Sequence, residues 1–436
     1  KSRVHYMGAR PQFDAVVIGS GISGLTAAIN LQRNGIRTLV VERREVPGGL
    51  CGTFTLDGYE FVTGCNDFGG GLVRHLEELG VGTEFRTPAA RFHLGEQRIE
   101  MPPTLPTLAT VARRLPALFS AFRTVRKDPG QTLGQLIDGA VQDRLLMAAA
   151  AIPAYALLRS PDDLTVEQVG QAYSKELGYR YQKSYTPVGG PAAMIAAMVQ
   201  RFEALGGELW LGCHSTQVER VGAQKRVHTS DALVSARVVL SSAGRWSEFP
   251  KTTKAGMEFA LLLFAVRKGF TYPRGYHTIA WLQQDIGEEL RKLDAGQPSS
   301  RPSFHIFRSD LPQPRDHYTI NAFIPLPRGE GDPSAQRRQD LSAHAVATID
   351  KDLPGFKDAL IYQRFLSPGE YASRLGLRSA PSPFVPPTGF AGLPSYDAAR
   401  DTYFIGTSVG PAGEHAGAAC LSGKMAADLA IKQLRR

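Results

Sequence analysis

Apolar and polar residues near the start of this chain follow the spacing of a strand, a helix and a second strand. Residues 14–18 form a short apolar run, which is typical of a buried parallel strand. Residues 25–34 carry apolar side chains at helical spacing and end before a glycine. Residues 36–41 are a second apolar run, and Glu42 closes it 18 residues after Gly24. The pattern therefore predicts a βαβ unit.

Apolar runs typical of strands and apolar side chains at helical spacing continue to the end of the chain. Helices are expected at 72–79, 108–127, 133–158, 166–177 and 192–205, with a last one opening at 422–428. Strands are expected at 208–211, 226–229, 236–240, 257–266 and 403–407. Pro116 should kink the helix at 108–127 or split it in two, because proline lacks the backbone donor. Strands thus alternate with helices, which predicts the α/β class.

The turn between the first strand and the first helix has the spacing G-x-G-x-x-G. It consists of Gly19, Ser20, Gly21, Ile22, Ser23 and Gly24. The first glycine permits a tight turn, the second lets the backbone approach a pyrophosphate, and the third lets the helix pack closely on the strands. The helix N-terminus offers N–H groups and a positive dipole end to phosphates. Glu42 stands where a carboxylate accepts hydrogen bonds from ribose hydroxyls. We therefore predict a dinucleotide site.

Composition narrows the class of protein. The 436 residues exceed what one core usually holds, so more than one domain is expected. The four cysteines are too few and too scattered for a disulfide framework or a metal site, and no metal ligands are predicted. No stretch has the apolar length of a membrane span, and residues 1–13 lack the apolar core of a signal peptide. We expect a cytoplasmic protein with reduced thiols.

The formal charge of +9 has two interpretations. The simpler one is that Lys and Arg are scattered over a large solvated surface. Nucleic acid is not a predicted partner, because the sequence shows no helix-turn-helix pattern and no aromatic–basic platform. The second interpretation comes from the helix at 108–127, whose apolar residues share one face and whose charges are all basic. Such a helix either packs on its own domain or makes a peripheral contact with the anionic inner face of a membrane.

The residues after Glu42 extend the signature of the βαβ unit. Arg43 is followed by Pro47-Gly48-Gly49-Leu50, and Asp57-Gly58-Tyr59 leads to Phe61 and Gly64. This pattern resembles the N-terminal signature of the flavin amine oxidase superfamily. It is most similar to the branch that contains phytoene desaturases, carotenoid isomerases and retinol saturases.

The resemblance implies FAD as the cofactor and covers nearly the whole chain, most strongly residues 14–64 and 403–428. It adds Arg43, Gly49, Leu50 and Gly64 to the expected cofactor contacts. It also implies that the backbone of Val218 meets the adenine. The glycine loop at 68–71 either comes close to the flavin or pyrophosphate, or is an ordinary turn.

The C-terminal segment resembles the end of the same superfamily. There, Gly406 lets the backbone approach the ribityl-phosphate, and a helix N-terminus with Thr407 and Ala418 faces the flavin ring. The dipole of that helix would favour negative charge on the reduced ring. Glu414 and His415 are the candidate catalytic residues, expected to tune the ring, with a plain surface loop as the alternative. Cys420 does not stand where covalent flavin cysteines occur, so FAD is expected to bind noncovalently.

The predicted architecture is a discontinuous, Rossmann-like FAD-binding domain of the glutathione reductase type with an inserted α+β substrate domain. The FAD-binding domain is predicted at 8–90, 185–250 and 391–436, and the substrate domain at 91–184 and 251–390. The second of these resembles the substrate half of phytoene desaturase-like proteins, which builds one wall of an apolar tunnel. His277 and His305 lie in it and are interpreted as structural.

Three functions are compatible with this pattern. The first is an FAD-dependent oxidoreductase that exchanges hydride between flavin N5 and a hydrophobic, conjugated small molecule of polyene or isoprenoid type. The second is a flavin amine oxidase acting on a C–N bond, for which an aromatic cage and a Lys near N5 would be expected. The third is a non-catalytic lipid carrier of the GDP-dissociation-inhibitor type. The intact glycine turn and Glu42 favour a cofactor-binding enzyme. The sequence indicates no particular oligomeric state.

Overall fold

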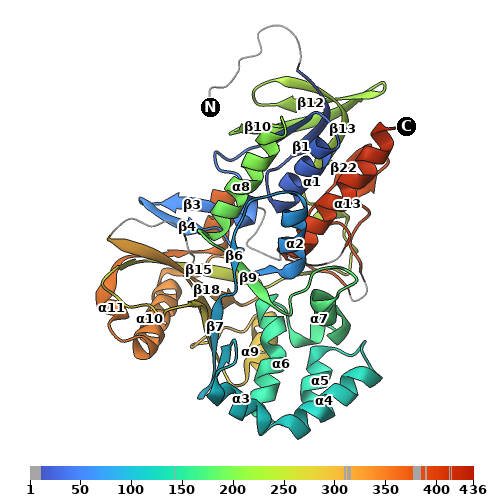
Figure 1. Ribbon diagram of the computed structural model, residues 1–436. Coiled ribbons are helices and arrows are strands. Elements are labelled where there is room, and N and C mark those ends of the chain that lie inside the picture. Colours follow the sequence, from blue (N-terminus) through green and yellow to red (C-terminus); the bar gives the residue numbers. More distant parts are fainter. Residues whose placement is uncertain are drawn as a thin grey trace.

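The computed structural model describes residues 11–141, 143–308, 311, 316–376, 384–387, 390–411, 413 and 415–436. Figure 1 shows two units, each built on a β-sheet, with the first described strand and the last helix in the same unit. The fold is therefore mixed α/β with two domains, as the sequence predicts.

An eight-stranded, mostly parallel sheet forms the first unit. Its main path runs in the order β10-β2-β1-β13-β12-β11, and β22 adds to β13 on the same sheet. The parallel strands are β1 (Gln12–Ile18), β2 (Thr38–Glu42), β10 (Glu208–Leu211), β13 (Leu233–Ser241) and β22 (Thr402–Phe404). The antiparallel strands are β11 (Ser215–Val221), β12 (Gln224–Thr229) and β21 (Tyr396–Asp397).

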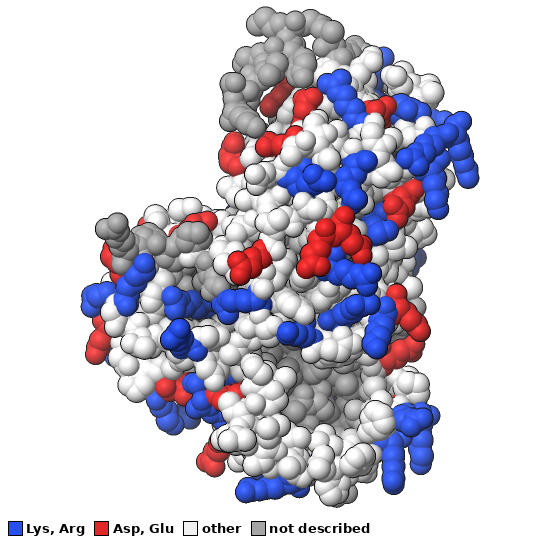
Figure 2. Space-filling view, viewed as in Figure 1, with Lys and Arg blue, Asp and Glu red and all other residues white. Residues whose placement is uncertain are grey.

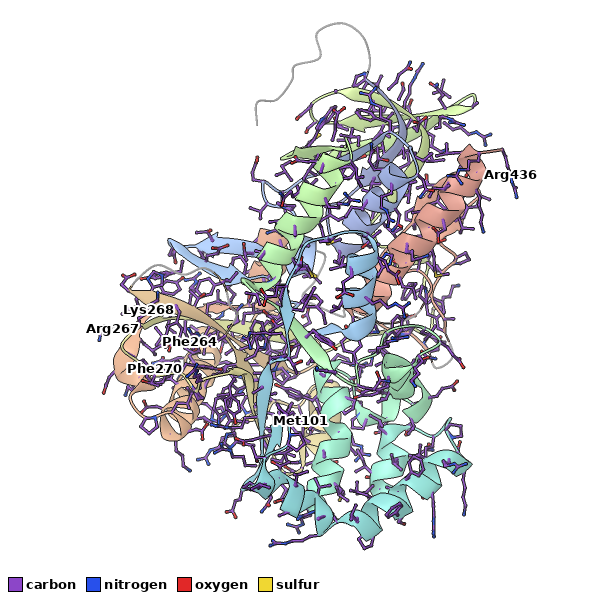
Figure 3. The ribbon with its side chains drawn as sticks, in the orientation of Figure 1. Met101, Phe264, Arg267, Lys268, Phe270 and Arg436 are labelled. Atoms are coloured by element: carbon purple, nitrogen blue, oxygen red, sulfur yellow. The ribbon has the colours of Figure 1, made fainter. Side chains whose placement is uncertain are left out.

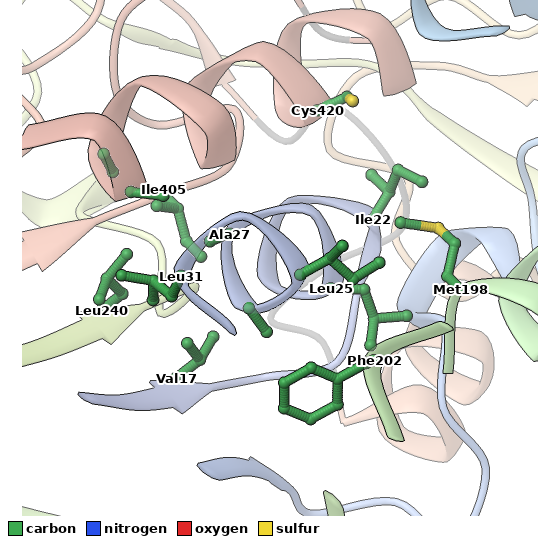
Figure 4. Close-up of a cluster of buried hydrophobic side chains, with 14 of the residues drawn as sticks. Val17, Ile22, Leu25, Ala27, Leu31, Met198, Phe202, Leu240, Ile405 and Cys420 are labelled. Atoms are coloured by element: carbon green, nitrogen blue, oxygen red, sulfur yellow. The ribbon is translucent and has the colours of Figure 1, made fainter. Parts of the chain in front are cut away.

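Helices cover one face of this sheet (Figure 1). They are α1 (Ile22–Arg33), α2 (Gly70–Glu78), α8 (Gly190–Ala204) and α13 (Ala416–Leu434). The core lies around α1, where Leu25 is fully buried between side chains such as Val17, Met198 and Phe202 (Figure 4). A second cluster on the other face contains Phe13, Val16 and Cys213. Both faces are thus buried, which explains why β1 and β2 read as continuous apolar runs.

The second unit is built on a seven-stranded sheet. Its order is β19-β15-β18-β17-β16-β7-β8, and only the β16–β7 pair is parallel among these strands. The strands are β7 (Ala89–Leu94), β8 (Gln97–Met101), β15 (Glu258–Arg267), β16 (Tyr276–Leu282), β17 (Phe304–Phe307), β18 (His317–Leu326) and β19 (Leu360–Leu366).

Helices pack on both faces of the second sheet. On one face lie α10 (Ala335–Asp352) and α11 (Phe356–Ala359), where Phe264 and Phe270 contact Phe356 (Figure 3). The other face packs against helices and against a β-hairpin of the first unit. These elements are α5 (Leu133–Ala140), α6 (Arg144–Ala156), α9 (Ile286–Asp294), α12 (Pro368–Leu375), β3 (Thr53–Leu56) and β4 (Tyr59–Val62).

Short elements complete the described chain. The helices are α3 (Leu105–Ala112), α4 (Leu115–Lys127) and α7 (Val166–Tyr173), with 3-10 turns η1 (Gly49–Cys51), η2 (Pro161–Asp163) and η3 (Trp246–Glu248). The strands are β5 (Phe68–Gly69), β6 (Phe85–Arg86), β9 (Ser184–Pro187), β14 (Lys254–Ala255) and β20 (Phe384–Val385). Within the described residues, no helix combines the length and apolar character needed to cross a membrane.

The hairpin β3–β4 ties the two units together. Asn321 Nδ2 donates to Val62 O at 2.9 Å, and Thr319 Oγ1 donates to Glu60 O at 2.7 Å. Tyr371 Oη of α12 donates to Thr63 O at 2.7 Å. These hydrogen bonds hold the second sheet and α12 against the hairpin that follows the glycine-rich turn. The face of the sheet that packs on this hairpin is called its inner face. The predicted limits of the two domains stay a prediction.

Two helix predictions need correction, and a third is confirmed. The segment 133–158 is two helices, because the Asp143 carboxylate accepts hydrogen bonds from Leu145 N and Leu146 N and starts α6. The segment 108–127 is also split, as expected, and Pro116 lies in the first turn of α4, where its missing N–H costs little. The last helix begins at Ala416 rather than at 422.

Candidate dinucleotide-binding site

The glycine-rich turn has the close backbone contacts that the sequence predicts. Gly19 has a φ of +100°, and a Cβ there would lie 2.0 Å from Ser242 Oγ. A Cβ at Gly24 would lie 1.9 Å from Gly19 O, so any side chain would push α1 off the turn. The predicted roles of these two glycines in the turn and in helix packing are confirmed.

Gly21 is glycine for a different reason. A Cβ at this position would meet no protein atom within 4 Å, so packing inside the chain does not exclude a side chain. Gly21 is the N-cap of α1 and has no side chain that could cap it. The first N–H groups of a helix have no partner within the helix, and its dipole favours an anion there. The open space before α1 therefore fits a pyrophosphate.

Glu42 is fixed beside this turn. Its Oε2 accepts hydrogen bonds from Ser20 N and Ser20 Oγ, both at 2.8 Å, and its Oε1 accepts from Arg44 N at 3.0 Å. The side chain is nearly buried. A carboxylate has about four acceptor positions, so it keeps capacity for the hydroxyls of a ribose. The geometry fits the predicted contact with a dinucleotide.

Arg44, and not Arg43, is the arginine that holds the walls of this site. Arg44 Nη1 donates to Gly49 O at 3.3 Å, and Nη2 donates to Thr53 O at 2.9 Å. Arg43 is exposed and points to the end of α12, where a Cβ at Gly376 would lie 2.6 Å from its Cζ. Neighbouring side chains at the end of a strand point to opposite sides, which is why the two arginines differ.

The segment from Gly48 to Gly52 forms the next wall. Gly48 N donates to Ser20 O at 3.0 Å, and a Cβ at Gly49 would lie 3.3 Å from Gly21 Cα. Leu50 O accepts a hydrogen bond from Cys65 N at 2.8 Å, which brings Gly64 alongside. At Gly64 the protein leaves room for a Cβ, whose nearest atom would be Tyr371 Oη at 3.5 Å. As at Gly21, packing within the chain does not require glycine here.

The C-terminal segment closes the site from the other side. Gly406 has a φ of +101° and donates its N–H to Ser422 Oγ at 2.8 Å. A Cβ at Gly423 would lie 2.2 Å from Ser23 O, so α13 rests directly on the start of α1. Ser422 and Gly423 therefore lie inside the helix and join it to the turn. The predicted cofactor contacts of Gly406, Thr407 and Ala418 stay predictions.

His415 has a structural role that the sequence did not reveal. It is the N-cap of α13, and its Nδ1 accepts a hydrogen bond from Ala418 N at 3.2 Å. Its ring packs edge-on against Tyr179 and Tyr181, with centroid distances of 4.4 and 5.0 Å. Burial lowers the pKa of His415 to about 4, so the ring is neutral at pH 7. The other candidate, Glu414, lies outside the described residues.

The glycine loop at 68–71 is packed by protein. A Cβ at Gly71 would lie 1.4 Å from Gly178 O, and one at Gly69 would lie 2.3 Å from Tyr179 O. Gly70 N also donates to Arg180 O at 3.1 Å. These glycines let the segment 178–181 lie directly on the loop, which explains them without a cofactor.

Two further sequence candidates lie away from the turn. Val218 is in β11 and belongs to the apolar cluster that contains Val41 and Cys213; its contact with adenine stays a prediction. His305 Nδ1 lies 2.9 Å from Tyr155 Oη, and His277 is fully buried with its ring stacked on Phe307. Both histidines are held by protein contacts, as the structural interpretation predicts.

The described residues form few other candidate sites. No three His, Cys, Asp or Glu side chains converge there as metal ligands do. A groove of about 700 Å³ lies between α10 and β19, lined by residues such as Arg338, Val346 and Phe365. None of the residues predicted to bind the cofactor lines that groove.

Residues 17–76 match the family described as NAD(P)-binding Rossmann-like domain. This part of the chain has the Rossmann-like fold that the family model describes. Similar sequences include prolycopene isomerase 2, chloroplastic, of an Oncidium hybrid cultivar, 51% identical over 53 residues, which are 12% of this chain and 9% of that protein. All-trans-retinol 13,14-reductase of Rattus norvegicus is 50% identical over 58 residues, 13% of this chain and 10% of the reductase. The chain thus spans about a tenth of the length of the curated relatives it matches.

Solved structures resemble the whole fold. Cyclohexylamine oxidase from Brevibacterium oxydans aligns with a TM-score of 0.65 at 16% identity, over 98% of this chain and 100% of the oxidase. An oxidoreductase from Methanosarcina mazei aligns with a TM-score of 0.64 at 16% identity, over 95% of this chain and 99% of that one. At these identities the similarity shows the two-domain fold alone. In that fold the second sheet lies beside the glycine-rich turn.

Replacing His415 by asparagine should make the protein less sensitive to acid. The pKa of His415 is about 4 in the folded protein and about 6.5 in the unfolded chain, so the unfolded chain takes up the proton first as pH falls through this window. The free energy of unfolding should fall on the order of 2 kcal/mol between neutral pH and about pH 5. His415→Asn keeps a capping acceptor without a titrating group and should lose this part of the dependence, while the part that comes from His305, whose pKa is also about 4, stays. Chemical denaturation at both pH values measures it.

His214→Asn is the matched control for this experiment, because His214 is exposed and should leave the acid sensitivity unchanged. Equal acid sensitivity in wild type and His415→Asn would contradict the assigned role.

Proposed function

We propose that the protein is an FAD-dependent oxidoreductase that acts on a hydrophobic, conjugated substrate of polyene or isoprenoid type. The observation behind the proposal is the open space at Gly21, before the N–H groups of α1, with the Glu42 carboxylate held beside it by Ser20. This open space is called the anion cradle. Local similarity to prolycopene isomerases and retinol reductases favours such a substrate. When bound, FAD would supply hydride exchange at N5. The step is a desaturation, a saturation or a redox-neutral isomerisation.

The chain's own residues would bind and orient this cofactor. The N–H groups at the start of α1 meet the pyrophosphate, and Glu42 accepts hydrogen bonds from the ribose. Arg44 keeps the segment at Gly49 against the turn. FAD would be held without a covalent bond, because Cys420 is buried in α13 with its Sγ 3.4 Å from Thr26 Oγ1.

We place the apolar substrate beside the face of the second sheet that packs against the β3–β4 hairpin. Phe259, Phe307 and Phe323 lie in one cluster with Phe61 and Val62 of the hairpin that leads to Gly64. Such side chains exclude water and give no hydrogen bonds to a polar substrate. The polar pair Tyr155–His305 also lies on this face, and burial lowers the pKa of His305 to about 4, so it brings no charge. These features favour an uncharged substrate over an amine.

Two alternatives are kept because they share the fold. A flavin amine oxidase is favoured by the similarity of the whole fold to cyclohexylamine oxidase. A non-catalytic lipid carrier would have the apolar wall but no need of the pyrophosphate cradle. The glycine turn with Glu42 argues for the enzyme.

We also propose that α3 and α4 make a peripheral contact with an anionic membrane. The structure describes no buried residue in α4, and Phe119 and Phe122 are 64% and 59% exposed. Leu105 is 83% exposed, and Met101, which precedes α3 (Figure 3), is 48% exposed. Figure 2 shows a mainly uncharged surface at this end of the molecule, with Lys and Arg at its margin. An exposed apolar face with a basic margin suits a lipid interface.

Purified wild-type protein should be yellow, and acid precipitation should release the colour to the supernatant. Gly21→Val should give colourless, folded protein, because the new side chain occupies the space that the pyrophosphate needs. Absorbance spectra of the supernatant and circular dichroism measure the two properties. Gly82→Val is the control, since a Cβ at Gly82 also meets no atom within 4 Å but lies away from the turn. Colour that stays in the pellet would refute noncovalent binding.

The flavin spectrum should respond to a polyene and not to small primary amines. Anaerobic rapid mixing of the yellow protein with each compound, and with NAD(P)H, measures the response. Phe307→Ala should slow the polyene-dependent spectral change by roughly 10-fold or more, because it removes part of the apolar wall. Rapid bleaching by amines, with no response to any polyene, would support the amine oxidase alternative instead.

The protein should sediment with anionic liposomes at low salt and bind neutral liposomes poorly. Each basic residue near an anionic surface adds about 1 kcal/mol, so Arg113, Arg123 and Arg126 replaced by Gln should abolish most binding. Arg114 is left intact because it pairs with Asp143 at 3.0 Å. Lys251, Lys268 and Lys432 replaced by Gln are the control of equal charge. Equal sedimentation of the two triple variants would show that only net charge matters.

A further inference from the structure

The groove of about 700 Å³ between α10 and β19 has a largely apolar floor. Val346 is nearly buried and Phe365 is half-buried, and both belong to the hydrophobic cluster beneath α10. Ser342 is also nearly buried, and its hydroxyl donates to Arg338 O at 2.7 Å, so it needs no partner from outside the protein. The floor therefore suits apolar groups of a partner.

The groove is elongated. Helix α10 lines it from Arg338 to Ala347. At about 1.5 Å per helical residue, this stretch of α10 is roughly 14 Å long. A β-strand rises about 3.3 Å per residue, so the groove has the length of about four residues of an extended chain.

The other side of the groove is an edge strand. Among the described residues, β19 pairs with β15 on one side and with no strand on the other. Gln363 and Arg364 of β19 are exposed and line the groove. The outer edge of such a strand carries backbone N–H and C=O groups with which an extended peptide can pair as an additional strand.

The charged side chains that line the groove are all basic. They are Arg338, Lys357 and Arg364. Glu370 lies beside two of them, and its carboxylate accepts a hydrogen bond from Arg338 at 3.2 Å and one from Arg364 at 3.4 Å. Because one carboxylate is shared between two guanidinium groups, these side chains keep an excess of positive charge. A partner that brings carboxylates to the groove is complementary to it.

We propose that this groove binds an extended acidic peptide segment of another protein, which pairs with the outer edge of β19. Successive side chains of a strand point to opposite sides, so residues at every second position contact the apolar floor. The residues between them carry the carboxylates that meet the basic groups at the rim. This inference concerns a partner and is independent of the proposed redox function.

Fluorescence anisotropy with the full chain and a labelled octapeptide of alternating glutamate and valine tests the proposal. The peptide should bind, and raising NaCl from about 50 to about 500 mM should weaken binding by about 10-fold or more, because salt screens the charges. A lysine–valine octapeptide should not bind. A glutamate–proline octapeptide should bind about 10-fold more weakly or worse, because proline has no N–H to pair with a strand.

Two substitutions at Ala343 locate the binding site. Ala343 is exposed on α10 and lines the groove, so the fold tolerates a long helix-forming side chain there. Ala343→Glu should raise the dissociation constant of the glutamate–valine peptide by about 10-fold or more, because it adds a like charge, whereas Ala343→Lys should stay within about 3-fold of wild type. Ala223→Glu is the control of equal charge, since Ala223 is exposed between β11 and β12 of the first unit.

Several results would overturn the proposal. Failure of the glutamate–valine peptide to bind would remove its basis, and equal binding of the glutamate–proline peptide would exclude pairing with β19. Wild-type affinity in Ala343→Glu would place the peptide elsewhere. Equal loss of affinity in Ala343→Glu and Ala343→Lys would refute the charge argument for an acidic partner. A dimer in size-exclusion chromatography that Ala343→Glu dissociates would show that a second copy of this chain occupies the groove instead.

Discussion

Close backbone packing around the turn at residues 19–24 is the constraint on which the rest of the structure depends. Within the turn, a Cβ at Gly24 would lie 1.9 Å from Gly19 O. Two other segments approach the turn closely: a Cβ at Gly423 would lie 2.2 Å from Ser23 O, and one at Gly49 would lie 3.3 Å from Gly21 Cα. Each approach brings a different part of the chain to the start of α1. The result is a helix N-terminus whose N–H groups face open space while its sides are closed.

This packing explains why the dinucleotide domain is discontinuous. The strand and helix at the N-terminal end cannot cover the turn alone, so α13 from the C-terminal end rests on it and Ser422 holds Gly406 in place. The second sheet is attached to the hairpin that leads to Gly64 by hydrogen bonds such as the one from Asn321 Nδ2 to Val62 O. An anion cradle and an apolar wall thus meet at one segment, and the proposed chemistry needs both.

Local patterns predicted much of the fold. The expected strand at 208–211 has the same limits in β10, and the expected ends of β1 and α8 are within two residues. These elements are buried and strongly periodic, so their pattern determines them. The helix expected at 133–158 was wrong, because the cap at Asp143 depends on where its carboxylate points. The last helix began earlier than expected for a similar reason: His415 caps it from within a segment that looks like a loop.

The sequence by itself determined the βαβ unit, the glycine positions and Glu42, because each of these depends on steric rules that act over a few residues. Only the tertiary structure decided which of two adjacent arginines holds the site and which polar atoms remain unpaired. Arg44 reaches Gly49 O and Thr53 O, whereas Arg43 points to α12. Only the structure shows that Thr63 Oγ1 and Asn66 Oδ1 are buried without a hydrogen-bond partner among the described residues. Burial and pairing depend on contacts between distant segments, which no local spacing encodes.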